Sequence, residues 1–243
     1  YAMIAYQTAY LKTYYPNEFI AASMSNELSN TDKLSEFFEE LKRLKIDVQR
    51  PCINNCFAEF VPKKNTLFYA LGAIKNVGYE SISAVVDERK VNGKYKSIGD
   101  FINRVNPKNI NKLQLEGLVK AGAFDSIFAN KKVLYENIPN MIQNSKNLYD
   151  NKIQNQSSLF SDESDKASYL IEDKNKNKWS IEENLAKEFE AIGFYMSNHP
   201  LSDYEDILVH KNVKHYAEFE SSNQSTCTLA GTIMTVKEKK TTK

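Results

Sequence analysis

The feature that most limits the fold of this chain is a long polar stretch between Gln143 and Lys178. Most residues in it are Asn, Gln, Ser, Asp, Glu or Lys. Such a segment cannot bury enough apolar surface to offset its own ordering entropy. We therefore expect a flexible segment over 143–178, with the packed parts of the chain on either side of it.

Within this stretch Leu159 and Phe160 are adjacent, in the sequence QSSLF. Two adjacent apolar residues in a polar segment make a poor core but a good anchor for a partner's pocket, and Gln156 can add a hydrogen bond. The alternative is that the pair fastens a loop to its own domain. The residues alone leave both interpretations open.

Composition narrows the class of protein. The chain is 42% hydrophobic and 26% charged, as soluble domains are, and its net charge of +1 means that any nucleic-acid contact needs a local patch. No apolar run approaches the roughly 20 residues of a membrane span. The three cysteines fit a reducing cytoplasm, and Cys52 and Cys56 lack the second pair typical of a zinc site. We expect a cytoplasmic protein with no membrane partner.

Helical patterns dominate the first 50 residues. Residues 1–15 contain good helix formers and small residues, and the predicted helix ends at Pro16, because the residue before a proline disfavours helical geometry. Pro16 then suits the first turn of a second helix. A third helix is predicted by apolar residues at helical spacing. These residues are Leu34, Phe37, Phe38, Leu41 and Leu44. Residues 52–74 predict loop and short strands.

Beyond residue 74 the sequence contains two turns that include glycine, Asn76–Gly78 and Ala121–Ala123. Each turn lies between two predicted helices. A helix, a tight hairpin and a second helix bring backbone N–H groups to one tip beside a helix N-terminus, which favours anions. Two such units side by side hold DNA phosphates without reading base sequence. The residues predicted to contact DNA are Lys75, Val77, Gly78, Lys112, Lys120, Gly122 and Ala123.

A structural role for both turns remains open. Two plain αα-hairpins with glycine at a helix end give the same pattern. In addition, Asn76 stands where the usual tip has its first glycine, which weakens the phosphate prediction for the first hairpin.

A further helix is predicted after the polar stretch, over 179–201. Ser180 and Glu183 form a capping-box pattern at its start, and Gly193 marks its far end. Residues 227–237 have the pattern of a first β-strand that the chain leaves unfinished. Because the chain also starts inside a helical pattern, we expect it to be a piece of a longer protein.

Several of these segments together resemble one protein family. YAMIAYQTAYLKTYYPNEFIAA is similar to the fingers signature of the alpha subunit of bacterial DNA polymerase III, a C-family replicative polymerase. LGAIKNVGYESISAVV and LEGLVKAGAFD resemble its tandem helix-hairpin-helix module. EFEAIGFYMSNHPL resembles the helix that leads into its OB domain, and LAGTIMTVKEKKTTK resembles the start of that OB fold.

The resemblance covers essentially the whole chain and implies five parts. They are part of the polymerase fingers at 1–70, the tandem helix-hairpin-helix DNA-binding module at 71–142, the flexible segment with a clamp-binding motif at 143–178, a helical connector at 179–222 and the start of an OB fold at 223–243. The expected fold class is mainly α, with the first strand or strands of a truncated OB β-barrel at the C-terminus.

The resemblance also implies where the chemistry lies. The family's fingers contact the incoming nucleotide and the template pair, and Tyr6, Gln7 and Lys12 lie in that signature, although Lys12 also reads as an ordinary helix-surface lysine. The catalytic carboxylates that hold two Mg²⁺ ions belong to the palm, which would precede Tyr1. We find no catalytic or metal-binding candidate in this chain and no cofactor. We therefore expect it to be inactive alone, although its parent is a DNA-directed DNA polymerase.

Partners follow from the same resemblance. QSSLF matches the family's internal motif for the sliding clamp, which implies that Gln156, Leu159 and Phe160 bind the clamp's beta subunit. Duplex and primer-template DNA and the other subunits of the polymerase III holoenzyme are further implied partners. Two rival classes remain open: a non-catalytic, clamp-tethered DNA-binding adaptor, and a helical scaffold that binds only protein.

Overall fold

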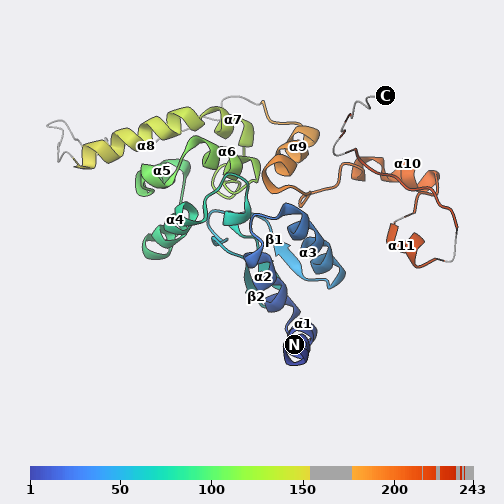
Figure 1. Ribbon diagram of the computed structural model, residues 1–243. Helices are drawn as coiled ribbons and strands as arrows, with labels where there is room; N and C mark the ends of the chain where they lie inside the picture. The colour runs from blue at the N-terminus through green and yellow to red at the C-terminus, as the bar shows by residue number, and fades with distance from the viewer. Residues whose placement is uncertain (154–176, 215, 223–224, 234–235, 237, 239–243) are drawn as a thin grey trace, which may run out of the picture. The chain divides into compact units, whose positions relative to one another are not determined.

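The computed structural model describes residues 1–153, 177–214, 216–222, 225–233, 236 and 238. The chain divides into two compact units, Tyr1–Met196 and Ser197–Lys243. The prediction of a mainly α fold is confirmed, with one small sheet in the first unit (Figure 1).

Three helices open the first unit: α1 (Ala2–Tyr14), α2 (Pro16–Asn26) and α3 (Thr31–Arg43). As predicted, Pro16 lies in the first turn of α2. The Asn30 side chain caps α3 by accepting a backbone hydrogen bond at 3.3 Å. The predicted apolar face of α3 buries Leu34, Phe38 and Leu41. This face anchors the helix to the core, whereas α1 has no buried residue at all.

Two of the strands, β2 (Val61–Lys63) and β3 (Thr66–Phe68), lie in the region 52–74 where short strands are expected, and they form a sheet with β1 (Asp47–Gln49), which precedes that region and is not predicted. The strand order is β1-β3-β2, with β1 parallel and β2 antiparallel to β3. Leu67 in the central strand pairs with Val48 on one side and Pro62 on the other. Pro62 lies on an edge strand, which tolerates the missing N–H. Leu67 is completely buried, so the central strand faces the core.

The middle of the first unit is built from short helices: η1 (Leu71–Ala73), α4 (Tyr79–Asn92), α5 (Ile98–Arg104), η2 (Pro107–Asn109) and α6 (Lys112–Lys120). Ser97 caps α5 as predicted, its Oγ accepting a backbone hydrogen bond at 3.1 Å. The ring of Phe101 meets the rings of Tyr95 and Phe124 edge-on, with 5.1 Å between centroids in each pair. These buried rings tie α5 to the segments before α5 and after α6.

Among the described residues of the first unit, the short helix α7 (Lys131–Glu136) and the longer helices α8 (Ile138–Ile153) and α9 (Ile181–Ile192) follow α6. Helix α8 continues into the stretch that the sequence predicts as flexible from residue 143. Ser145 is only 1% exposed and Leu148 packs against the core, so this part of the stretch contributes to α8 packing on α5 and α6. The predicted start of the flexible segment is therefore corrected: residues 143–153 are helical.

Helix α9 begins as predicted. The Ser180 Oγ accepts a hydrogen bond from the Glu183 N–H at 3.1 Å, and the Glu183 carboxylate accepts one from the Ser180 N–H at 2.8 Å. Gly193 ends the helix with a φ of +97°. The predicted connector at 179–222 is divided in the structure, because the first unit extends to Met196 and therefore includes α9.

The second unit contains three short helices: η4 (Ser202–Tyr204), α10 (Glu205–His210) and α11 (Tyr216–Glu220). The sequence predicts a strand at 227–237, but residues 225–233 form none. A lone strand has no partner for its backbone groups, and sheets need several strands to be stable. Across the residues that the structure describes, no helix is both long and apolar enough to cross a membrane.

Candidate nucleic-acid interface

The first hairpin tip lies directly before α4. Its turn is closed by a hydrogen bond from the Val77 N–H to the Ile74 carbonyl at 3.0 Å, and Gly78 is the N-cap residue of α4. No side chain among the described residues caps this end of the helix. The N–H groups of the first helical turn lack intrahelical partners, so the α4 N-terminus can accept an anion.

Asn76 gives this tip the conformation that the usual glycine would supply. Its φ is +66°, in the left-handed region, which asparagine tolerates better than most residues. The departure from the glycine pattern noted in the sequence therefore leaves the turn itself intact.

Two other helices hold the first tip in place (Figure 1). On α6, a Cβ added to Gly117 would lie 2.7 Å from the Lys75 carbonyl oxygen, so the helix backbone and the tip are in close contact. On α9, the Ala191 carbonyl accepts a hydrogen bond from the Lys75 N–H at 2.9 Å. The tip is thus fixed by contacts from segments 40 and more residues away, which is the rigidity that a binding site needs.

The charge at this tip comes mainly from Lys75. Its side chain is exposed, its Nζ lies 6.0 Å from the ring centroid of Phe189, and no described carboxylate forms an ion pair with it. Lys112, at the start of α6, is also exposed and lies 3.8 Å from Glu116. Glu80, in the first turn of α4, is the acidic residue that opposes an anion here.

The second predicted tip has a different environment. Gly122 has a φ of +78°, as a tip glycine should, but it is buried together with Ala123. The N–H groups of these two residues donate to the α6 carbonyls of Val119 and Leu118, at 3.0 and 2.9 Å. The sequence predicts a phosphate contact at this tip; the structure instead uses its N–H groups to close α6, because the following Phe124 enters the core.

Lys120 is also placed differently from the prediction. Its side chain is only 10% exposed, and its Nζ lies 2.7 Å from Glu190 Oε1 on α9. Burial disfavours the charge of Lys120, but the hydrogen bond and the charge of Glu190 outweigh it and raise the pKa of Lys120 above its ordinary value. Glu190 also pairs with Lys187 at 3.3 Å.

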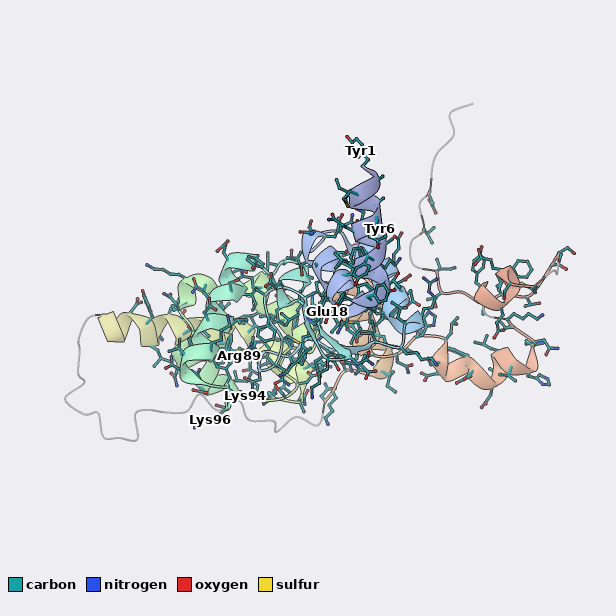
Figure 2. The ribbon with its side chains drawn as sticks, turned by 90° about the horizontal axis from the view of Figure 1, so that it is seen from below. Tyr1, Tyr6, Glu18, Arg89, Lys94 and Lys96 are labelled. Atoms are coloured by element: carbon teal, nitrogen blue, oxygen red, sulfur yellow. The ribbon has the colours of Figure 1, made fainter. Side chains whose placement is uncertain are left out.

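The predicted nucleotide-binding residues lie on α1. Tyr6 is 68% exposed and lines a surface hollow with Gln7, Tyr10 and Leu11. Figure 2 shows Tyr6 along α1, where the helix extends beyond the rest of the first unit. Lys12 lies 3.5 Å from Glu40 on α3, so its charge is already matched. The structure keeps Tyr6 and Gln7 together and available.

The predicted clamp-binding residues Gln156, Leu159 and Phe160 lie outside the described residues.

The residues present do not fit a Mg²⁺ site. Within the described ranges, no group of three or more His, Cys, Asp and Glu side chains could hold a metal ion. Cys52 and Cys56 are both buried thiols, and burial raises the pKa of Cys56 to about 12.

Glu190 and Lys187 were not predicted as part of the site. Their spacing of three residues is typical of an exposed helical ion pair, which is all the local sequence indicates. Lys120, which forms an ion pair with Glu190, is 70 residues away from it in the sequence.

Comparison with known proteins agrees with this geometry. A family described as helix-hairpin-helix motif matches residues 45–134, which include both tips. The chain is 40% identical to DNA polymerase III subunit alpha of Borreliella burgdorferi over 214 residues, 86% of this chain. It is 38% identical to the same subunit of Campylobacter jejuni, over 91% of this chain. It is also 38% identical to that of Caulobacter vibrioides, over 90% of this chain. The chain spans 18–19% of the length of these relatives.

Proposed function

We propose that this chain, which is homologous to a segment of bacterial DNA polymerase III alpha subunits, holds duplex DNA by its phosphates at the first hairpin tip. The observation that carries the proposal is the uncapped N-terminus of α4, preceded by the exposed and unpaired Lys75. The match to a helix-hairpin-helix family over the same residues supports it.

The physical basis is a cluster of hydrogen-bond donors around Gly78, which has no side chain. Backbone N–H groups and the positive end of the α4 dipole favour a phosphate, and Lys75 adds a full charge. Contacts of this kind fix the protein on the duplex and carry no base information. We therefore propose binding that is independent of base sequence and sensitive to salt.

A substitution at Gly78 can distinguish an effect on phosphate binding from an effect on folding. A Cβ added there would meet Gln114 Nε2 at 3.5 Å and Ser81 Oγ at 3.7 Å, which are ordinary contacts, and its φ of −72° suits any residue. The fold therefore tolerates alanine at Gly78, whereas a phosphate approaching the backbone would meet the added methyl group. Lys112, on the neighbouring helix α6, supplies a second and weaker phosphate contact in this proposal.

The remaining roles belong to the whole protein and rest on its relatives. We propose that the parent protein performs template-directed DNA synthesis with Mg²⁺ in the cytoplasm, together with other holoenzyme subunits. In that protein Tyr6 and Gln7 meet the nucleotide or template, and Gln156, Leu159 and Phe160 bind the sliding clamp. This chain alone should incorporate no nucleotide into primed DNA, and incorporation by a contaminant-free preparation above a control without protein would contradict that.

Two experiments separate the proposal from its rivals. A duplex titration at several salt concentrations distinguishes a DNA-binding module from a scaffold that binds only protein, because only the former shows affinity that falls as salt rises. The coding sequence upstream of Tyr1 distinguishes a polymerase from a clamp-tethered adaptor, since the polymerase requires a cluster of carboxylates there.

A further inference from the structure

Two residues near the end of α9, Phe189 and Ala191, contact Lys75 in the first hairpin tip. The Phe189 ring lies 6.0 Å from Lys75 Nζ, and the Ala191 carbonyl accepts the Lys75 N–H at 2.9 Å. Between them, Glu190 extends its carboxylate to Lys120 at 2.7 Å and to Lys187 at 3.3 Å. The helix that contacts the first tip therefore also carries a carboxylate that pairs with two lysines.

The exposures of these side chains show which group covers which. Glu190 is 53% exposed, whereas Lys120 is 10% exposed. Solvent thus reaches the carboxylate, while the ammonium of Lys120 lies behind it and above the Tyr135 ring, 5.4 Å from its centroid. An outward turn of the Glu190 side chain would leave the Lys120 ammonium without its ion-pair partner.

The carboxylate of Glu190 does not stabilise helix α9 itself. A negative charge in the last turn of a helix is disfavoured by the helix dipole. Packing of α9 on the first unit already comes from buried apolar residues such as Leu185, Ala191 and Ile192. The carboxylate therefore has another reason to be where it is.

We propose that Lys120 and Lys187 form a second phosphate subsite beside the first tip, and that Glu190 occupies it until a DNA phosphate displaces the carboxylate. This inference rests on the proposed DNA binding and extends it by two lysines. In the free protein the Glu190 carboxylate offsets one of the two positive charges of the subsite. On the duplex, each lysine exchanges a carboxylate for a phosphate, so wild-type binding gains less from them than from Lys75.

The test is a duplex titration of Glu190→Gln against Glu182→Gln. Both changes remove one negative charge from α9, but Glu182 is an exposed residue of the first helical turn and forms no ion pair with a described lysine. We expect Glu190→Gln to raise the affinity for duplex DNA about tenfold at low salt, which corresponds to about 1.4 kcal/mol. It should also steepen the dependence on salt, because each additional phosphate contact adds about 0.9 to the slope. Glu182→Gln should change affinity by about twofold or less.

Two further variants keep the result interpretable. Lys120→Gln in the Glu190→Gln background should remove the gain, which ties it to the subsite. Glu190→Ala should reproduce the gain if Glu190→Gln folds poorly, and the emission of Trp179, the single tryptophan, reports folding because its ring lies 5.6 Å from Tyr135.

The outcomes separate the two proposals. If the wild type binds DNA and the two glutamine variants bind equally, the subsite is wrong and the proposed function stands. If neither the wild type nor any variant binds duplex at low salt, both proposals are wrong. Binding by Glu190→Gln alone supports the subsite but contradicts the first hairpin tip as the DNA contact of the wild-type protein.

Discussion

Asn76 and Gly122 share the left-handed backbone conformation, with φ of +66° and +78°, and each lies in the tip of one of two successive hairpins. Their surroundings differ: Asn76 is exposed on the surface, and Gly122 is buried against the following segment. The same hairpin pattern in the sequence thus gives one tip that is exposed to solvent and one that is buried in the core.

The first prediction concerns the backbone at Asn76. Asn76→Val should lower the free energy of unfolding by about 1–2 kcal/mol, because a β-branched side chain is disfavoured in the left-handed region. Asn76→Gly is the matched control and should stay within about 0.5 kcal/mol of the wild type or gain stability. Urea unfolding measures both. Equal stability of the two variants would show that the turn relaxes to another conformation.

A second prediction concerns the contact of α6 with the tip. In Gly117→Ala the new methyl carbon would lie 2.7 Å from the Lys75 carbonyl oxygen, which is held by the bond of Lys75 to α9. Overpacking of about 1–3 kcal/mol should exceed the gain of about 1 kcal/mol from replacing a helical glycine, so stability should fall. The control is Gly231→Ala, where nothing lies within 4 Å of the added Cβ. Thermal unfolding that leaves Gly117→Ala at or above the wild type would contradict the close contact.

The local parts of this fold could be predicted from the sequence, and the distant ones could not. The capping box of Ser180 and Glu183 and the cap at Ser97 depend on residues three apart, so the pattern itself contains them. The pairing of Lys120 with Glu190 spans 70 residues, and no local pattern indicates it. For the same reason the sequence predicts a phosphate contact at both tips and a weaker one at the first, since burial of the second tip depends on where Phe124 packs.

A third prediction is a pH dependence at Glu88. Burial would raise the pKa of Glu88, but hydrogen bonds from Arg104, Asn92 and Tyr95 and the charge of Arg104 lower it below its ordinary value. A lowered folded-state pKa stabilises the protein above the unfolded value of about 4.3 and loses that effect as pH falls through the folded value. Wild-type stability should therefore fall more than that of Glu88→Gln between about pH 5 and pH 3.

The control for this measurement is Glu59→Gln, which changes an exposed glutamate. Its acid sensitivity should match that of the wild type. Parallel acid unfolding curves for the wild type and Glu88→Gln would mean that the pair with Arg104, 2.8 Å apart, contributes nothing to stability.

A fourth prediction tests the clamp motif. Burying a leucine or phenylalanine side chain contributes roughly 1.5–3 kcal/mol, so replacing both Leu159 and Phe160 with alanine should cost on the order of 3–5 kcal/mol of clamp affinity. Calorimetry with the bacterial sliding clamp should show no measurable binding for the double variant and nearly unchanged thermal stability. Replacing Ser157 and Ser158 with alanine is the control and should preserve most of the affinity. A clear loss of stability without a change in clamp binding would assign the pair to the chain's own fold.

The most direct test of the central claim is the affinity of Gly78→Ala and Lys75→Gln for duplex DNA, measured by fluorescence anisotropy across a series of salt concentrations. Lys63→Gln, which changes an exposed lysine on β2, is the charge control. We predict that Gly78→Ala lowers affinity about tenfold and lowers the free energy of unfolding by no more than about 1 kcal/mol, because alanine is a poorer N-cap than glycine. Lys75→Gln should lower the salt slope by about 0.9, and Lys63→Gln should leave it unchanged. Wild-type affinity for the duplex in both tip variants, or no binding by the wild type at low salt, would contradict the assignment of the first hairpin tip as the DNA contact.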